Sequence, residues 1–208
     1  MPVQRAMQRD EQAIEQWRSQ AWPRLLAEAR HERRTLVFVD EAGFYLLPSV
    51  VRTYAPCACT PVLRAKLTRD HLSVMGGMTP AGRVYTLARQ ESLNGSHSVE
   101  FLVHLTRVAS QRLLVIWDGS PIHRRAMVRQ FVAETHGKVR LEALPGYAPD
   151  LNPWDAGGWN HLKNVEMRNL ACKDPEELHE EFHLAVNRLR QKAWLVHSFF
   201  AQAGLKLN

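Results

Sequence analysis

The chain has 208 residues, of which 45% are hydrophobic, 23% charged and 8% aromatic. A chain of this length and apolar content buries about two thirds of its unfolded surface, which predicts one globular domain and excludes a disordered or collagen-like protein. The 27 Lys and Arg residues exceed the 21 Asp and Glu residues, giving a net charge of +6 that favours a nucleic-acid partner, although many basic proteins bind no polyanion.

The sequence predicts neither a membrane segment nor a secretion signal. No apolar run approaches the roughly 20 residues of a membrane span, and residues 1–34 are charged throughout. Three cysteines make no disulfide framework, and Cys57 and Cys59 lack the second pair of a zinc site. A cytoplasmic protein is therefore expected.

Hydrophobic periodicity predicts a helical N-terminal segment and then strands and helices. Apolar residues recur every three or four positions from Arg9 to Arg34, and we interpret residues 1–34 as a helical linker at the edge of the core. The predicted strands are Thr35–Asp40, Val51–Ala55, His71–Met78, Arg83–Ala88, Arg112–Asp118 and Val139–Leu144. The predicted helices are Ser98–Ala109, Pro121–Thr135, Pro153–Cys172, Pro175–Gln191 and Trp194–Ala203.

This order of elements predicts an α/β fold. The opening strands are expected to pair antiparallel, with a turn over residues 41–43, and the later strands to join through right-handed crossovers. The expected architecture is a mixed five-stranded sheet with helices on both faces.

Two buried strands each end in an aspartate, Asp40 and Asp118, and Asp155 follows a loop rich in Pro and Asn. Adjacent parallel strands place their carboxyl ends in one crevice, so these carboxylates are expected to converge. Such a group suits Mg²⁺ or Mn²⁺, and two ions about 4 Å apart support phosphodiester cleavage.

Each aspartate also has a structural interpretation. Asp40 and Asp118 fit turn positions, and Asp155 fits the third position of a helix capped by Asn152. Glu41 is expected to point away from Asp40 because neighbouring side chains on a strand alternate.

Four motifs together resemble one family. They are Phe-Val-Asp40-Glu-Ala-Gly-Phe-Tyr-Leu-Leu-Pro48, Val-Ile-Trp-Asp118-Gly-Ser-Pro-Ile-His123, Leu144-Pro-Gly-Tyr-Ala-Pro-Asp-Leu-Asn-Pro153 and Trp159-Asn-His-Leu-Lys163. The sequence resembles the bacterial insertion-sequence transposases of the six-thirty family, relatives of the mariner elements. The resemblance implies an RNase H-like DDE/D catalytic domain over residues 35–208, with Asp40, Asp118 and Asp155 as catalytic metal ligands. It further implies a nucleoid-associated enzyme that cuts element ends and joins the 3′-hydroxyl to target DNA at a TA step.

Two departures from the family leave alternatives open. Relatives have Asn-Pro-x-Glu-x-x-Trp, so counting from Pro153 gives Asp155 as the acid, whereas counting back from Trp159 gives Ala156. The helix-turn-helix domains of full-length relatives are absent from this sequence, which implies a partner subunit or a homodimer. The alternatives are a catalytically impaired remnant that binds DNA weakly or dimerises, and an RNase H-like nuclease without transposition.

Overall fold

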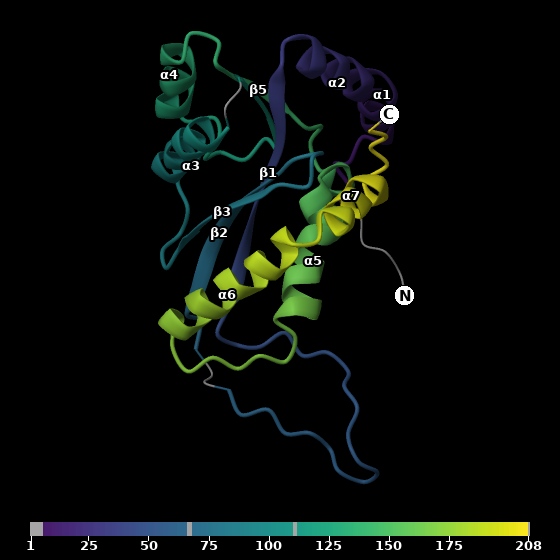
Figure 1. The fold of residues 1–208 in the computed structure, drawn as a ribbon, viewed down its shortest axis with the longest axis vertical. Helices are drawn as coiled ribbons and strands as arrows, with labels where there is room; N and C mark the ends of the chain where they lie inside the picture. The colour runs from purple at the N-terminus through teal and green to yellow at the C-terminus, as the bar shows by residue number, and fades with distance from the viewer. Residues whose placement is uncertain (1–5, 66–67, 110–111, 208) are drawn as a thin grey trace.

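A five-stranded sheet forms the centre of the computed structural model, which describes residues 6–65, 68–109 and 112–207 (Figure 1). Its strands are β1 (Arg34–Tyr45), β2 (His71–Met78), β3 (Val84–Arg89), β4 (Arg112–Trp117) and β5 (Val139–Ala143), in the order β3-β2-β1-β4-β5. The pairs β1–β2 and β2–β3 are antiparallel, and β1–β4 and β4–β5 are parallel. The predicted mixed five-stranded sheet is confirmed.

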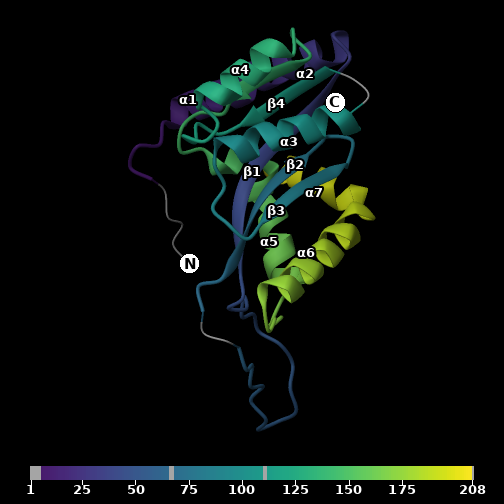
Figure 2. The same ribbon diagram turned by 90° about the vertical axis from the view of Figure 1, so that its left-hand side faces the viewer.

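Helices cover both faces of this sheet, as predicted (Figures 1 and 2). Alternation along β1 sends Val37 and Val39 into one core, with α3 (Gly95–Val108) and α4 (Ala126–Glu134), and Leu36 and Phe38 into a larger core on the other face. The larger core contains residues of α6 (Pro175–Arg190) and α7 (Ala193–Gln202). No helix within the described ranges has the length and apolarity that crossing a bilayer demands.

The N-terminal helices belong to the larger core. They are α1 (Glu11–Gln16), the π-helical turn η1 (Trp17–Ala21) and α2 (Trp22–His31). The Trp22 ring lies 5.7 Å from that of Phe38, which in turn contacts Phe200 at 5.5 Å. The interpretation of this segment as an edge outside the core was therefore wrong. Its large apolar side chains recur at helical spacing, and the face that they form is buried in the larger core. Residues 1–5 of the predicted linker lie outside the described residues, and a domain division at residue 34 stays a prediction.

Two predictions were wrong in the region that follows Asp40, a turn over residues 41–43 and a strand over Val51–Ala55. Residues 41–43 continue the strand instead of turning, because their partners on β2 extend the ladder to Tyr45, whose ring covers Gly43. Val51–Ala55 is no strand and most of it is exposed; its β-branched residues pair with no neighbouring strand in the described chain. The described part of the segment between β1 and β2 extends from the body of the molecule (Figure 1).

The helical predictions hold with shifted ends. The helix expected from Pro121 begins at Ala126, after a series of turns. The helix expected over Pro153–Cys172 ends at Glu166 and consists of the π-helical turn η3 (Trp154–Gly158), α5 (Trp159–His161) and a second π-helical turn, η4 (Leu162–Glu166). Before it, residues Pro149–Leu151 form a short 3₁₀ turn, η2.

Candidate active site

Asp40 and Asp118 lie just beyond the last paired residues of two neighbouring parallel strands, and β1 itself continues past Asp40 to Tyr45. The last paired residues of β1 and β4 are Phe38 and Ile116, and each aspartate comes two positions after its strand's member of that pair. The two aspartates therefore share one register at one edge of the sheet, where open α/β sheets bind ligands. Asp118 is exposed, and its Oδ1 also accepts a hydrogen bond from the Ser120 amide at 2.9 Å, as in the turn interpretation.

Asp40 is held by an indole. Trp159 Nε1 donates a hydrogen bond to Asp40 Oδ2 at 2.6 Å, and the Trp159 ring stacks on Trp154 at 4.1 Å. Burial raises the pKa of Asp40 well above its ordinary value, and the charge of Asp155 raises it further, although the Trp159 hydrogen bond opposes both effects. An ionised Asp40 is thus electrostatically costly without a cation.

Gly76 makes room for the two stacked indoles. It pairs with Asp40 across β1 and β2, and a Cβ there would lie 2.6 Å from Trp154 Cζ2 and 2.7 Å from Trp159 Cη2. Trp154 is fully buried and cannot move aside without disturbing the core.

We therefore expect Gly76→Ala to destabilise the protein by about 1–3 kcal/mol and to weaken the Trp159–Asp40 hydrogen bond. Urea unfolding and tryptophan fluorescence measure the two effects. Gly77→Ala is the matched control, because its Cβ would meet Phe101 and Val37 only at 3.1 Å on the other face. Equal losses of stability in both variants would refute this account of Gly76.

Asn152 ties the helical segment that carries Asp155 to the end of β1. The Asn152 side chain donates to the Val39 carbonyl oxygen at 3.1 Å and accepts from the Trp154 amide at 3.2 Å. Both bonds are buried, and they fix the start of η3 beside the residue that precedes Asp40. The helix-capping role predicted for Asn152 is borne out by the bond to Trp154.

The charge of Asp155 interacts with those of the other two aspartates, whereas Ala156 packs against the larger core. Partial burial and then the charge of Asp118 raise the pKa of Asp155 to about 6, whereas Lys163 opposes this rise. The sequence left Asp155 and Ala156 as alternatives for the third acid. In the structure, the charge of Asp155 raises the pKa of Asp40, and the charge of Asp118 raises the pKa of Asp155.

A π-helical turn accommodates both counts along this segment, the one from Pro153 and the one from Trp159. In η3 the Trp159 amide donates to the Trp154 carbonyl five residues earlier, so this turn contains one more residue than an α-helical turn. Asp155 keeps its place relative to Pro153, and Trp159 still reaches Asp40. The expectation of a regular helix, in which the two registers conflict, was wrong because the extra residue is absorbed within the turn.

Lys163 supplies a positive charge near these carboxylates. Burial lowers the pKa of Lys163, while the charges of Asp155 and Asp40 raise it. Its Nζ also lies 5.2 Å from the centre of the Phe44 ring. Lys163 thus partly compensates the repulsion between acidic groups in the metal-free protein.

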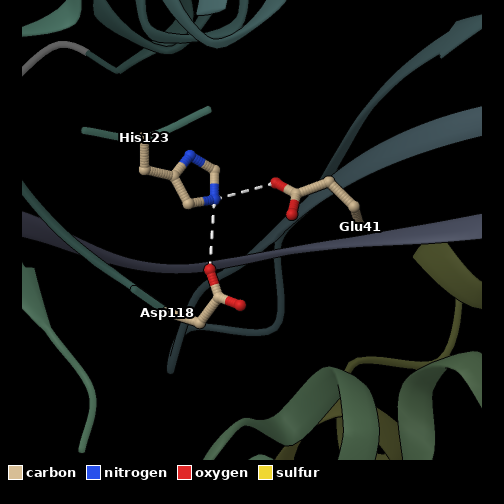
Figure 3. Close-up of side chains that lie close together, drawn as sticks. All are labelled: Glu41, Asp118 and His123. Carbon is tan, nitrogen blue, oxygen red and sulfur yellow. Dashed lines mark ion pairs between the residues drawn. The ribbon is translucent and has the colours of Figure 1, made fainter. Parts of the chain in front are cut away.

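Glu41 and His123 lie next to Asp118, a contact that sequence reasoning missed (Figure 3). Glu41 alternates with Asp40 along β1, as expected, yet its charge still raises the pKa of both Asp40 and Asp155. The Glu41, Asp118 and His123 ligand atoms all lie within 4.8 Å of one another. The only sequence signal was a histidine five positions after Asp118.

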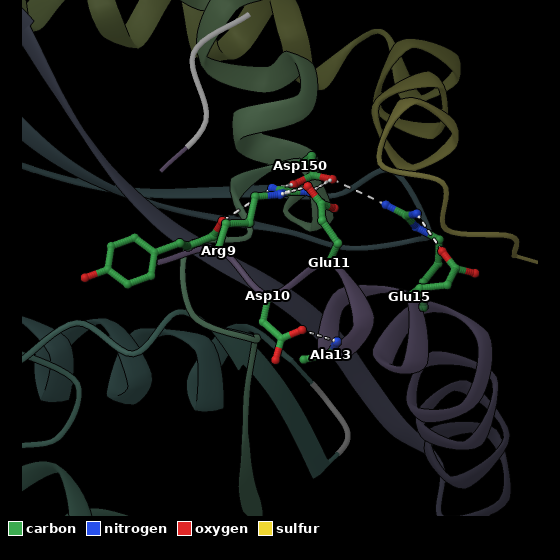
Figure 4. Close-up of polar contacts among 8 residues, drawn as sticks. Arg9, Asp10, Glu11, Ala13, Glu15 and Asp150 are labelled. Carbon is green, nitrogen blue, oxygen red and sulfur yellow. Dashed lines mark hydrogen bonds and ion pairs between the residues drawn. The ribbon is translucent and has the colours of Figure 1, made fainter. Parts of the chain in front are cut away.

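Two other carboxylates near the motifs are bound in ion pairs. Asp150 pairs with Arg9 at 2.5 Å and with Arg18 at 3.4 Å, which bridges the loop to the N-terminal segment (Figure 4). Glu166 pairs with Arg188 and Lys192, each at 2.6 Å, and these bonds hold its pKa at about 2 despite burial. Both carboxylates therefore serve as structural anchors.

Comparison with known proteins places the chain in a family. Residues 35–179 match DDE superfamily endonuclease. The fold is similar to Mos1 transposase in a paired-end complex with the left transposon end, at 16% identity and a TM-score of 0.62, over 100% of this chain and 67% of that chain. The Mos1 mariner paired-end complex with Mn gives 16% identity and a TM-score of 0.61, over 98% and 66% of the respective chains.

The Mos1 mariner catalytic domain alone gives 15% identity and a TM-score of 0.54, over 99% of this chain and 100% of that one. This chain thus spans the catalytic domain and about two thirds of the longer Mos1 chains. The curated proteins include no match.

Proposed function

Because the chain belongs to the DDE superfamily endonucleases, we propose that it is the catalytic domain of a DNA transposase. It cleaves DNA phosphodiesters at element ends and joins the freed 3′-hydroxyl to target DNA. The observation that carries this proposal is the shared register of Asp40 and Asp118 at one edge of the sheet, with Asp155 in electrostatic reach of both.

Asp40, Asp118 and Asp155 are the proposed catalytic ligands for Mg²⁺ or Mn²⁺. Their chemistry fits a divalent cation, because carboxylates that repel one another and are partly buried gain most from a positive partner. Two bound ions would supply activation of the attacking oxygen and stabilisation of the leaving oxygen. Within the chain, Trp159 orients Asp40, and Lys163 balances charge until a cation binds.

The finer assignments complete the proposal. The motifs support a bacterial insertion-sequence transposase of the six-thirty family that acts on cytoplasmic, nucleoid DNA and targets a TA step. The net charge of +6 supports contact with the DNA backbone. Residues 35–208 contain the proposed catalytic residues, and residues 1–34, whose described helices pack in the same core, connect this unit to the rest of the assembly. That assembly is a homodimer or a complex with a subunit that carries helix-turn-helix domains.

An impaired remnant is the second candidate, favoured by the aspartate and the extra residue in place of the family's Asn-Pro-x-Glu-x-x-Trp. Calorimetry with Mg²⁺ separates the two. For an active site, Asp155→Ala is expected to weaken Mg²⁺ binding by at least about tenfold. Asp150→Ala is the matched control and should leave Mg²⁺ binding unchanged, because Asp150 pairs with Arg9.

Activity tests the proposal directly. Purified protein should nick DNA in the presence of Mg²⁺ or Mn²⁺ and stop when the ion is chelated. Joining of a pre-cut end to target DNA distinguishes a transposase from a nuclease that only cuts. Unchanged Mg²⁺ affinity in Asp155→Ala, together with no nicking by the wild type, would support the remnant instead.

A further inference from the structure

His123 points a fixed imidazole at two carboxylates (Figure 3). Its Nε2 lies 3.0 Å from Glu41 Oε1 and 3.5 Å from Asp118 Oδ1, and only 1% of its side chain is exposed. The ring stacks on Trp117 at 4.0 Å with an interplanar angle of 12°. Stacking and burial therefore fix the direction in which Nε2 points.

Three polar atoms of this cluster make no hydrogen bond in the described structure, and the ion-pair contacts of His123 Nε2 are made only within the cluster. Neither ring nitrogen of His123, nor Glu41 Oε1, makes a hydrogen bond with any part of the chain that the structure describes. A buried polar atom left unsatisfied typically costs about 1–3 kcal/mol, so native proteins rarely leave several together. His123 Nε2 and Glu41 Oε1 are therefore free to bind a ligand placed between them.

The spacing suits a single metal ion. Ligand atoms about 2.1 Å from an octahedral ion lie about 3 Å apart when adjacent and about 4.2 Å apart when opposite. The 3.0 Å and 3.5 Å separations match adjacent ligands, and all three ligand atoms lie within 4.8 Å of one another. Small side-chain shifts would bring them onto one ion.

We propose that Glu41, Asp118 and His123 form a second cation site that takes a first-row transition-metal ion such as Mn²⁺ or Zn²⁺. The imidazole nitrogen sets its preference, because Mg²⁺ selects oxygen ligands whereas transition-metal ions accept nitrogen. The site goes beyond the proposed catalytic function and shares only Asp118 with it. Its occupancy does not require Asp40 or Asp155.

Pulsed electron paramagnetic resonance of bound Mn²⁺ tests this site, because a directly coordinated imidazole adds nitrogen modulation to the signal. The experiment uses the full chain with two background substitutions. The first, Asp40→Asn, removes one proposed catalytic ligand. The second, His183→Ala, is included because the His183 and His179 Nε2 atoms lie 3.3 Å apart on the surface and form a competing pair. We expect nitrogen modulation that survives a large excess of Mg²⁺ and disappears when Zn²⁺ is added.

His123→Gln should abolish the nitrogen modulation, and the exposed His104→Gln is the control that should preserve it. Glu41→Gln keeps the imidazole and the shape of the site, and it should weaken Mn²⁺ binding by at least about tenfold. This second variant tests the site even if His123→Gln does not fold. Absence of modulation, or its persistence in His123→Gln, overturns the proposal. Either result leaves the nicking assay as a separate test of the catalytic function.

Discussion

Asp40→Asn is expected to abolish metal-dependent DNA cleavage and at the same time to stabilise the metal-free protein. The carboxylate of Asp40 is buried and lies near the charge of Asp155, and both effects raise its pKa. Asparagine has nearly the same shape, and its Oδ1 can still accept from Trp159 Nε1, but it carries no charge. We expect nicking to fall at least about 100-fold. The melting temperature without metal should rise by about 2–4 °C for each kcal/mol of repulsion removed.

The pH dependence of stability follows from the raised pKa of Asp155. Its pKa is about 6 in the folded protein and near its ordinary value of 3.8 when unfolded. The folded state therefore binds the proton more tightly, so this contribution to stability is fully present below the unfolded pKa and is lost as pH rises through about 6. Without metal, the melting temperature of the wild type should fall as the pH rises through this window, and that of Asp155→Asn should fall less steeply.

Asp150→Asn separates these effects from a general loss of negative charge. Asp150 pairs with Arg9 and Arg18, and the hydrogen bond from Arg9 lowers its pKa. Its substitution should leave nicking intact and should lower stability, the opposite of the result for Asp40. If Asp40→Asn is less stable than the wild type without metal, or if it still nicks DNA, the electrostatic interpretation of the site is wrong.

The shared position of Asp40 and Asp118 was predictable because it follows from short apolar runs that are visible in the sequence itself, although β1 extends beyond its predicted end. Continuous apolar runs marked β1 and β4, and each ended in an aspartate. Parallel pairing then placed Asp40 and Asp118 at the same edge, and the register of β1 with β4 agrees. The third acid was harder, because two registers along one helix gave different residues.

The remaining features depend on contacts between distant segments. The position of Trp159 against Asp40 requires Gly76 on another strand, and no local pattern identifies that glycine. The His123–Glu41 contact joins a loop after β4 to the face of β1 opposite Asp40. The core role of Trp22 depends on Phe38 and Phe200, which lie far from it in sequence.

The second large effect concerns Gly157, where deletion should be better tolerated than substitution. The π-helical turn η3 holds one residue more than a regular turn, so removal of Gly157 should convert it to an α-helical turn. The deletion would also give the spacing between Pro153 and Trp159 found in the family that the motifs resemble. Asp155 precedes the removed residue and Trp159 follows it. Both should keep their positions, and nicking should stay within about tenfold of the wild type, a change of about 1.4 kcal/mol.

Gly157→Ala, in contrast, adds an atom where there is no space. A Cβ at this position would lie 2.4 Å from Phe199 Cδ1, and Phe199 is buried in the larger core. We expect a loss of about 1–3 kcal/mol in urea unfolding and a displaced Asp155, with a larger fall in nicking than the deletion causes. If the deletion variant is inactive and Gly157→Ala is normal, the extra residue is required in its own right and the π-helical turn is not an absorbed insertion.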